Sequence, residues 1–413
     1  MSLLSPEEQA FIQEHLQEDV STLALKLSRH VELNARLVLS QISGYQAVSH
    51  KVPTWSRFEQ VVYPPSLSLE QCSSEVTARY KASLTAREDM SVRRVCDLTG
   101  GFGVDFFFLA KGKESSLYVE RQEALCELAK HNFQVLGLTS ATIYRGDSTE
   151  VLNNLTASFD LIYLDPARRN AAGGKVVALS DCEPDVTLIK NQLLAKARYV
   201  LVKLSPMLDI TMALKQLPET AEVHVVSVDG ECKELLFLMQ ARPLAQEMHP
   251  SEKPEHVGVT RLICVNLRSN APDQFFSFTR KQEQTVVCRF CEKVRTYLYE
   301  PNASLLKAGA YAVLTQAYNV CKLHPNSHLY TSEQLIEDFP GRIFQVEASF
   351  PLHSRALKTY LSDRDKANIT VRNFPLSVVE IRKKTGLKEG GAIYLFATTL
   401  NDGSKVLLKT TRL

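Results

Sequence analysis

The clearest indication of the fold lies in residues 95–105, which read Val95-Cys-Asp97-Leu-Thr-Gly100-Gly101-Phe-Gly103-Val-Asp105. A short apolar run ends in the acidic residue Asp97, and a loop rich in glycine follows it. Glycine in such a loop lets the backbone approach a bound nucleoside or amino-acid group without a clash from a Cβ atom. The pattern therefore predicts a strand, a ligand-binding loop and a helix. The same elements without a ligand are the alternative for this motif alone.

The spacing of the glycines argues against a dinucleotide cofactor. A dinucleotide-binding loop has the pattern Gly-x-Gly-x-x-Gly, but counting from Gly101 and Gly103 puts Phe106 where the third glycine belongs. The carboxylate of Asp97 beside the loop would repel a diphosphate, whereas it suits a cationic cofactor that carries an amino-acid group. NAD and FAD are therefore disfavoured.

Two further acidic residues follow the next predicted strands. Glu120 lies 23 residues after Asp97, where one carboxylate can accept hydrogen bonds from both hydroxyls of a ribose. Taken alone, an acidic residue such as Glu120 is more often a solvated strand end. Asp147 follows the third strand, where its carboxylate could accept a hydrogen bond from an adenine amino group. The alternative role of Asp147 is to cap a helix that begins at Ser148.

The fourth signal is an apolar strand that ends in Asp165-Pro166-Ala167-Arg168-Arg169. Taken in order, the four signals resemble the cofactor and active-site motifs of class I S-adenosylmethionine-dependent methyltransferases, over roughly residues 95–239. The resemblance implies an α/β fold: a Rossmann-like class I methyltransferase core with an N-terminal helical region and a C-terminal α+β module. It implies S-adenosylmethionine as the cofactor, bound by Asp97, Thr99, Gly100, Gly101, Gly103, Glu120, Asp147 and Asp165.

The Asp165 loop departs from the pattern of that family. There, an Asp-Pro-Pro-aromatic or Asn-Pro-Pro-aromatic loop holds an exocyclic amino group through its side chain and a backbone carbonyl. Here Ala167 replaces the second proline and Arg168 replaces the aromatic residue. The resemblance implies a catalytic loop of Asp165, Pro166, Ala167 and Arg168 in which Asp165 orients the acceptor. Arg168 or Arg169 is expected to bind a phosphate through paired hydrogen bonds, with a surface ion pair as the alternative.

The arginine in this loop also resembles the Asp-Pro-Pro-Arg loop of uracil-5 RNA methyltransferases, which need a cysteine nucleophile after the fifth strand. The fifth strand expected here runs Val202-Lys203-Leu204-Ser205-Pro206 and offers no cysteine. Covalent C5 chemistry is therefore disfavoured. Direct in-line transfer to an amine or a ring nitrogen remains, with an exocyclic amine favoured, and such transfer needs positioning more than acid-base help.

A segment ahead of the core carries a weaker resemblance. Residues 71–80, with Ser74 and Glu75, are similar to the segment before the first core strand of several nucleic-acid methyltransferases, where it closes over the methionine moiety. A plain helix cap at Ser73 or Ser74 explains the same residues.

The periodicity of apolar residues predicts helices up to about residue 90 and then short strands alternating with helices. Such alternation is typical of a parallel, doubly wound sheet. After that sheet the sequence predicts a hairpin (221–228 and 233–239), a linker (243–257), a helix (Asn302–Val320), a strand (342–350) and a tail of helix, strand, helix and two strands joined at Asn401-Asp402-Gly403.

Composition limits the class of protein. No run approaches the roughly 18 apolar residues that a membrane span needs, and no signal peptide is evident at the N-terminus. A cytoplasmic protein that does not enter membranes is therefore expected. The odd number of cysteines, nine, indicates reduced thiols in place of a disulfide framework. No metal site is expected, although Cys288, Cys291, Cys321 and His324 are of the residue types that form zinc sites.

The charge is segregated along the chain. Residues 351–413 contain 12 Lys and Arg against 5 Asp and Glu, whereas the whole chain carries a net charge of +2. A basic tail on a mildly acidic body predicts a module that faces a polyanion. Residues 299–306 and the tail resemble bacterial class I methyltransferases that append a ferredoxin-like segment and a THUMP-like domain, THUMP being an RNA-binding module of tRNA-modifying enzymes. This resemblance implies RNA, either tRNA or rRNA, as the partner. RNA contacts are expected from Arg169, Arg382, Lys383, Lys384, Lys405 and Lys409.

These observations lead to an expected division of the chain and to a leading function. The expected parts are an N-terminal helical region (1–90), the methyltransferase core (91–245), a ferredoxin-like α+β segment (258–345) and a THUMP-like basic domain (346–413). An RNA methyltransferase acting on a base nitrogen is the leading hypothesis. A methyltransferase of a small molecule or protein remains an alternative, as does a non-catalytic RNA-binding protein with a relic cofactor fold.

Overall fold

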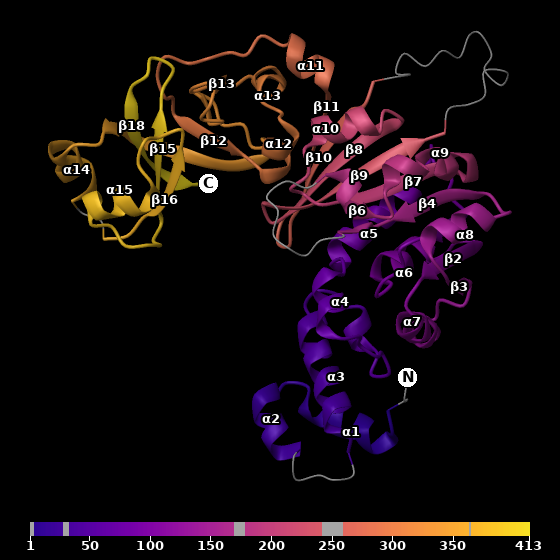
Figure 1. Cartoon of the computed structure of the whole chain (residues 1–413). Coiled ribbons are helices and arrows are strands. Elements are labelled where there is room, and N and C mark those ends of the chain that lie inside the picture. The colour runs from indigo at the N-terminus through magenta and orange to yellow at the C-terminus, as the bar shows by residue number, and fades with distance from the viewer. Residues whose placement is uncertain (1–3, 28–32, 169–177, 242–258, 363–364) are drawn as a thin grey trace, which may run out of the picture. The chain divides into compact units, whose positions relative to one another are not determined.

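The computed structural model describes residues 4–27, 33–168, 178–241, 259–362 and 365–413. The chain divides into two compact units (Figure 1). The first unit comprises Met1–Ala221 and Leu236–Glu255, and the second comprises Glu222–Leu235 and His256–Leu413. The predicted linker, residues 243–257, lies outside the described residues.

The N-terminal region is helical, as the apolar spacing predicts. Its helices are α1 (Pro6–His15), α2 (Val20–Leu27), α3 (Ala35–Val48), the 3-10 turn η1 (Trp55–Arg57), α4 (Ser66–Gln71) and α5 (Glu75–Thr85). The first helix begins at Ser5, whose hydroxyl caps it in a capping box with Glu8. Leu23, Val38 and Ile42 are buried in a shared apolar cluster, which joins α2 to α3. Burial of this stripe stabilises helices that would be marginal in isolation.

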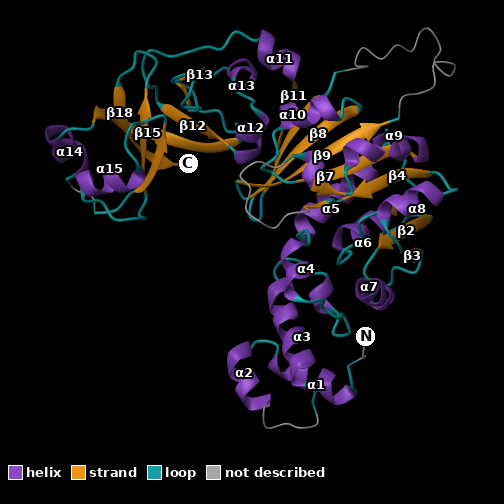
Figure 2. Ribbon diagram, viewed as in Figure 1, coloured by secondary structure: helices purple, strands orange, loops and turns teal. Residues whose placement is uncertain are grey.

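The core is one twisted sheet (Figure 2). Its strands are β1 (Arg94–Asp97), β2 (Ser115–Glu120), β3 (Ala141–Arg145), β4 (Phe159–Leu164), β7 (Ala197–Leu204), β8 (Thr220–Val228), β9 (Glu231–Gln240), β10 (Arg261–Leu267) and β11 (Gln274–Thr279). They lie in the order β11-β10-β8-β9-β7-β4-β1-β2-β3. The pairs β1–β2, β2–β3, β1–β4 and β4–β7 are all parallel. This topology confirms the expected Rossmann-like α/β fold, with the order reversing between β1 and β4.

Helices connect the parallel strands. They are α6 (Val104–Ala110), α7 (Glu123–Val135), α8 (Ser148–Asn154), α9 (Val186–Lys196) and α10 (Ile210–Gln216). Phe106, which stands where a dinucleotide-binding loop would have glycine, is fully buried in α6. Its ring lies 5.4 Å from that of Tyr118 and 5.2 Å from that of Phe133. The aromatic side chain therefore packs α6 against β2 and α7.

The sheet continues past residue 245, where the sequence suggested that the core ends. Strand β10 pairs with β8 in parallel, and β11 pairs with β10 in an antiparallel direction. The expected limits of the core and of the ferredoxin-like segment remain predictions.

The second unit contains a separate seven-stranded sheet in the order β13-β14-β12-β15-β18-β17-β16. Its strands are β12 (Tyr297–Pro301), β13 (Cys321–Lys322), β14 (Tyr330–Ser332), β15 (Gly341–Pro351), β16 (Asn368–Arg372), β17 (Ile393–Thr399) and β18 (Lys405–Arg412). Helices α11 (Arg280–Thr285), α14 (Ser354–Leu361) and α15 (Val378–Thr385) belong to the same unit. The tail follows the predicted order of helix, strand, helix and hairpin.

The prediction of one continuous helix in this unit is wrong. Residues Asn302–Val320 form two short helices, α12 (Ala303–Ala308) and α13 (Ala312–Ala317), instead of one. Gly309 follows α12 with a φ of +76° and ends it, because this left-handed conformation cannot continue a right-handed helix. Among the described helices, none is long and apolar enough to cross a membrane.

Gly100 packs so closely against Tyr118 that a side chain there would collide. A Cβ atom built on Gly100 would lie 2.3 Å from the ring of Tyr118, which is itself fully buried. We expect Gly100→Ala to lower the free energy of unfolding by about 1–3 kcal/mol through overpacking. In a Tyr118→Leu background, which lacks the outer ring atoms, the same substitution should cost much less. Urea denaturation of the four proteins checks this, and an equal cost in both backgrounds would contradict it.

Candidate cofactor and catalytic site

The carboxyl ends of β1 and β4 are joined through one hydroxyl. Because these strands are parallel neighbours, Asp97 and Asp165 emerge at the same edge of the sheet. The hydroxyl of Thr99 donates to Oδ1 of Asp97 at 3.2 Å and accepts the backbone N–H of Asp165 at 2.6 Å. The side chain of Thr99 therefore fixes the distance between Asp97 and Asp165.

Asp97 is a buried carboxylate with one oxygen left for a ligand. It is 1% exposed, and Thr99 donates to Oδ1 from both its N–H, at 2.8 Å, and its hydroxyl. No hydrogen bond to Oδ2 is formed by a residue that the structure describes. Burial raises the pKa of Asp97 to about 8. A cation placed beside Oδ2 would offset this cost of burial, so the residue fits a cofactor with an ammonium group.

Glu120 holds the glycine loop in place. Its Oε2 accepts the N–H of Gly101 at 2.9 Å, and its Oε1 accepts the N–H of Gln122 at 2.8 Å. The carbonyl of Gly101 in turn accepts the hydroxyl of Tyr118 at 2.5 Å. Each carboxylate oxygen can accept more than one hydrogen bond, so Glu120 can bind a diol while it holds the loop.

The three glycines of the loop have different surroundings. Gly100 and Gly103 lie against the rings of Tyr118 and Phe133, where an added Cβ would approach to 2.3 and 2.7 Å. Beside Gly101, with a φ of +57°, the nearest atom to an added Cβ is 3.7 Å away. Gly101 is therefore the position where a ligand could approach the backbone, while the other two glycines serve close packing.

Asp147 caps α8. Its Oδ1 accepts the N–H groups of Thr149 and Glu150 at 2.8 and 3.3 Å. The helix-cap alternative is therefore what the structure shows for this oxygen. A role in binding adenine remains a prediction.

The loop after β4 is partly described. Asp165 is half-buried and Pro166 is buried, while Ala167 is exposed. Residues Ala167–Arg168 form a short strand, β5, which pairs with β6 (Cys182–Glu183). Arg169 lies outside the described residues, and the side chain of Arg168 is not described.

The structure adds charged residues that the sequence did not single out. Nζ of Lys203, on β7, donates to Oδ2 of Asp165 at 2.5 Å. Asp105, on α6, forms an ion pair of 3.1 Å with Lys81, which is 0% exposed. Lys203 in an apolar strand and Lys81 in a helix that packs on the core are the signals that could have revealed them, because buried lysines need a partner.

Ser73 and Ser74 have separate roles before α5. Ser74 is the N-cap and accepts the N–H of Thr77 at 3.4 Å. Ser73 is buried, and its hydroxyl donates to Oδ2 of Asp105 at 2.7 Å. The segment ahead of the core therefore contributes a side chain to the charged cluster behind Asp165.

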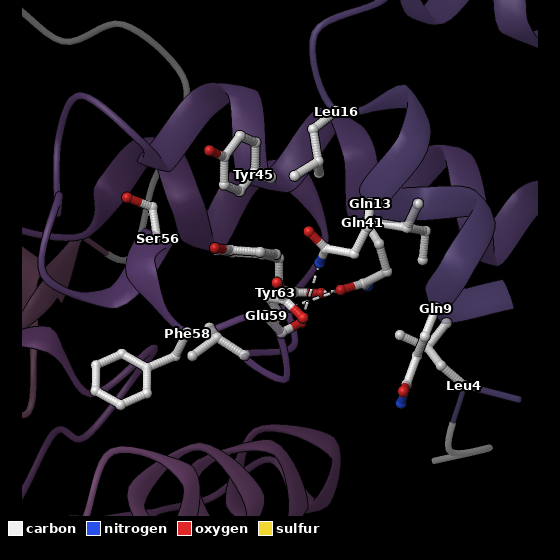
Figure 3. Close-up of a pocket in the computed structure, with 12 residues that line it drawn as sticks. Leu4, Gln9, Gln13, Leu16, Gln41, Tyr45, Ser56, Phe58, Glu59 and Tyr63 are labelled. Atoms are coloured by element: carbon white, nitrogen blue, oxygen red, sulfur yellow. Dashed lines mark hydrogen bonds between the residues drawn. The ribbon is translucent and has the colours of Figure 1, made fainter. Parts of the chain in front are cut away.

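A hollow in the N-terminal helices is too small to be the cofactor site. It is lined by residues of α1, α3 and the segment 56–63, and its volume is about 30 Å³ (Figure 3). Gln41 crosses it and exchanges two hydrogen bonds with the backbone of Tyr63, at 2.9 and 2.8 Å. A space of this size holds a few water molecules at most.

The predicted basic residues of the tail are not equally available. Arg382 donates to the carbonyls of Ala367 and Leu387, each at 3.3 Å. Lys409 is 12% exposed and lies 3.5 Å from Glu347. Lys383, Lys384 and Lys405 are exposed. These last residues are the better candidates for contacts with phosphate.

The cysteines considered as zinc ligands show no metal site. Among the residues that the structure describes, no group of His, Cys, Asp or Glu has the arrangement needed to hold a metal ion. Nδ1 of His324 accepts the N–H of Asn326 at 3.0 Å and lies 2.9 Å from the amide nitrogen of Asn373. Burial, together with a hydrogen bond to Cys321, raises the pKa of Cys291 to about 12, so this thiol keeps its proton at neutral pH.

A glycine loop and acidic strand ends on a doubly wound sheet define a Rossmann-like class I methyltransferase fold. A solved structure of a candidate methyltransferase from Porphyromonas gingivalis W83 is similar over 100% of both chains, with 34% identity and a TM-score of 0.85. Family models described as a ferredoxin-like domain and as THUMP domain-like match residues 297–340 and 341–412. The chain belongs to the family of the Porphyromonas protein.

A curated relative matches a smaller part of the chain. The 23S rRNA (uracil(1939)-C(5))-methyltransferase RlmD of Photobacterium angustum is 33% identical over 127 residues, which are 28% of this chain and 57% of the relative. The chain thus matches little more than half the length of that relative.

The raised pKa of Asp97 predicts a pH-dependent stability. Up to about pH 8 the folded chain retains a proton that the unfolded chain releases above about pH 4. The stabilisation is complete below pH 4 and is lost as the pH rises, by about 1.4 kcal/mol for each pH unit. Asp97→Asn should remove this slope. Urea unfolding of both proteins, stripped of bound small molecules, checks this between about pH 5 and 8, and parallel profiles would show that Asp97 is ionised in the folded chain.

Proposed function

We propose that this protein is an S-adenosylmethionine-dependent methyltransferase that methylates an exocyclic amine of a base in RNA. The observation that carries the proposal is the junction of Asp97, Thr99 and Asp165 at the carboxyl edge of the sheet. The likeness to the Porphyromonas protein over the whole chain supports the same activity class.

The residues at this edge fit the cofactor. The free oxygen of buried Asp97 suits the ammonium of its methionine part, and the carboxylate of Glu120 suits its ribose hydroxyls. Gly101 leaves room for the ligand beside the backbone. When bound, S-adenosylmethionine supplies a methyl group on a positively charged sulfur. No described residue at this edge needs to act as a nucleophile toward that group.

Asp165 is the residue proposed to orient the acceptor. One oxygen is bonded to Lys203, and the other can accept an N–H of an amine. Bound S-adenosylmethionine would supply the methyl group, Asp165 would hold the acceptor amine in place for it, and the proton that the amine loses would leave to solvent. Holding both reactants in this geometry is the main contribution of the protein.

Uracil C5 methylation, the reaction named for the Photobacterium relative, is less well supported here. That chemistry needs a cysteine thiolate, and two described cysteines, Cys72 and Cys182, bear on whether the site offers one. Burial raises the pKa of Cys72, whose thiol donates to the carbonyl of Leu69 at 3.1 Å. Cys182 is buried in β6. A buried thiol with a raised pKa, such as that of Cys72, is a poor nucleophile.

RNA as the substrate is supported by the second unit. The THUMP domain-like match covers residues 341–412, and the Photobacterium relative is named for rRNA. Exposed Lys383, Lys384 and Lys405 supply positive charge for phosphate contacts. We propose tRNA or rRNA as the substrate and the cytoplasm as the location. A small-molecule or protein substrate is the alternative if RNA is not bound.

Two substitutions should separate cofactor binding from methyl transfer. Glu120→Ala should weaken S-adenosylmethionine binding by about 1–3 kcal/mol, because charge-assisted hydrogen bonds are lost. Asp165→Ala keeps the backbone N–H that the Thr99 hydroxyl accepts, so that affinity should stay nearly intact. It should abolish transfer, because the proposed partner of the Asp165 carboxylate is the acceptor. Calorimetric titration and a methyl-transfer assay with total RNA check both. Turnover in Asp165→Ala would make Asp165 structural, and absence of heat with wild-type protein would remove the cofactor assignment.

Charge neutralisation on the second unit should weaken RNA binding in a salt-dependent way. Each phosphate contact contributes about −0.7 to the slope of log affinity against log salt on single strands. Replacing Lys383, Lys384 and Lys405 by Gln should lower RNA affinity and flatten this slope.

The matched control for that experiment replaces Lys111, Lys130 and Lys215, which are exposed lysines of the first unit. It changes the net charge equally, and the slope should stay near that of the wild type. Equal slopes for both triple variants would favour a solvated face and a substrate other than RNA.

A further inference from the structure

We propose that Lys203 is a positioning residue that fixes the Asp165 carboxylate for methyl transfer, and that a buried Lys81–Asp105 pair holds Lys203 in place. This inference rests on the proposed function, since it assigns a role toward the same acceptor. Lys203 and its supports were not among the residues expected from the sequence, and they act through Asp165 without touching the substrate.

The register of the sheet brings Lys203 beside Asp165. Strand β7 pairs in parallel with β4, and Val202 lies opposite Leu164. The residues that follow, Lys203 and Asp165, therefore lie side by side at the carboxyl edge of the sheet. Nζ of Lys203 lies 2.5 Å from Oδ2 of Asp165, with the lysine side chain 14% exposed and the aspartate side chain 36% exposed. The ammonium thus covers one oxygen of a carboxylate that is otherwise open to a ligand.

Besides Asp165, Lys203 contacts Ser73 and Asp105. Its Nζ donates to the hydroxyl of Ser73 at 3.1 Å and lies 3.8 Å from Oδ2 of Asp105. An ammonium has three N–H donors, and contacts on several sides fix their directions. The Lys203 ammonium is therefore held by several contacts, whereas the ammonium of a surface lysine moves freely.

Asp105 is the centre of this cluster. Its Oδ2 accepts the hydroxyls of Ser73 and Tyr163, each at 2.7 Å, and its Oδ1 lies 3.1 Å from Nζ of Lys81. Burial alone would raise the pKa of Asp105, but Lys81 and Lys203 lower it below its usual value. Asp105 therefore stays charged, and a charged Asp105 compensates Lys81, whose burial would otherwise be very costly.

The charges form two matched pairs, Lys81 with Asp105 and Lys203 with Asp165. Among the charges that the structure describes, removing Lys203 leaves Lys81 paired with Asp105 and takes the 2.5 Å partner away from the part-exposed Asp165. The fold should therefore tolerate the loss of Lys203. The Asp165 carboxylate, in contrast, should lose its fixed orientation, because Oδ2 would no longer be held. The acceptor would then lose its fixed partner.

Three substitutions test this role. Lys203→Met removes the ammonium, Lys203→Arg keeps a cationic donor, and Lys190→Met is the matched control. Lys190 is also part-buried, at 18% exposed, and pairs with Glu219 at 3.1 Å, but it lies on α9 and bonds to the segment before β8. For each protein we would measure the Kd of S-adenosylmethionine by calorimetry and kcat and KM for methyl transfer to RNA.

We expect Lys203→Met to lower kcat on the order of a hundredfold, the cost of misplacing a reacting group. Its cofactor Kd should be unchanged, Lys203→Arg should recover part of kcat, and Lys190→Met should behave as wild type. A kcat of Lys203→Met equal to that of Lys190→Met would overturn the proposal. So would a loss of cofactor affinity as large as the loss of kcat, since that would mark Lys203 as part of the cofactor site or the fold.

A second measurement does not depend on activity. In urea unfolding, the unfolding constant should rise several-fold more for Lys203→Met in the wild type than in an Asp165→Ala background, because the paired partner is already absent there. If Lys203→Met does not fold, Lys203→Gln replaces it in this cycle. Equal effects in both backgrounds would overturn the pairing. Absence of methyl transfer by the wild type would instead overturn the proposed function, with the unfolding cycle still deciding the role of Lys203.

Discussion

The hydroxyl of Thr99 joins the two acidic residues between which the proposed chemistry takes place. It donates to Asp97 at the end of β1 and accepts the N–H of Asp165 at the end of β4. A single side chain can make both bonds only because the two strands are parallel neighbours and end at the same edge. The doubly wound sheet thus supplies the geometry, and Thr99 fixes the distance across it.

Around that edge, apolar packing holds the glycine loop and ion pairs hold the Asp165 loop. On the side of β2, Gly100 and Gly103 lie against the buried rings of Tyr118 and Phe133, so the glycine loop rests on an aromatic layer. On the side of β7, buried charges hold the Asp165 loop through Lys203. The first support is stable because the aromatic groups exclude water. The second is stable because each buried charge has a partner of opposite sign.

The strands and the acidic residues at their ends could be predicted from sequence, because an apolar run that ends in Asp97 or Asp165 is a local signal. The contacts of Lys203 were beyond local patterns, since Ser73 is 130 residues away and Asp165 is 38. The same holds for Lys409, whose partner Glu347 lies on another strand. Helix 302–320 was overestimated because Gly309 has a left-handed conformation that apolar spacing does not reveal.

Methylation of an amine in RNA would leave a chemical record in the nucleosides of cellular RNA. Hydrolysed tRNA and rRNA from cells that lack the protein would be compared with those of wild-type cells by mass spectrometry. Intact RNA from the cells without the protein would then be treated with purified protein and labelled S-adenosylmethionine. We expect one base methylated on an exocyclic nitrogen to be missing from the mutant RNA and to be restored with label. A missing C5-methyluridine, or no difference between the two RNAs, would contradict it.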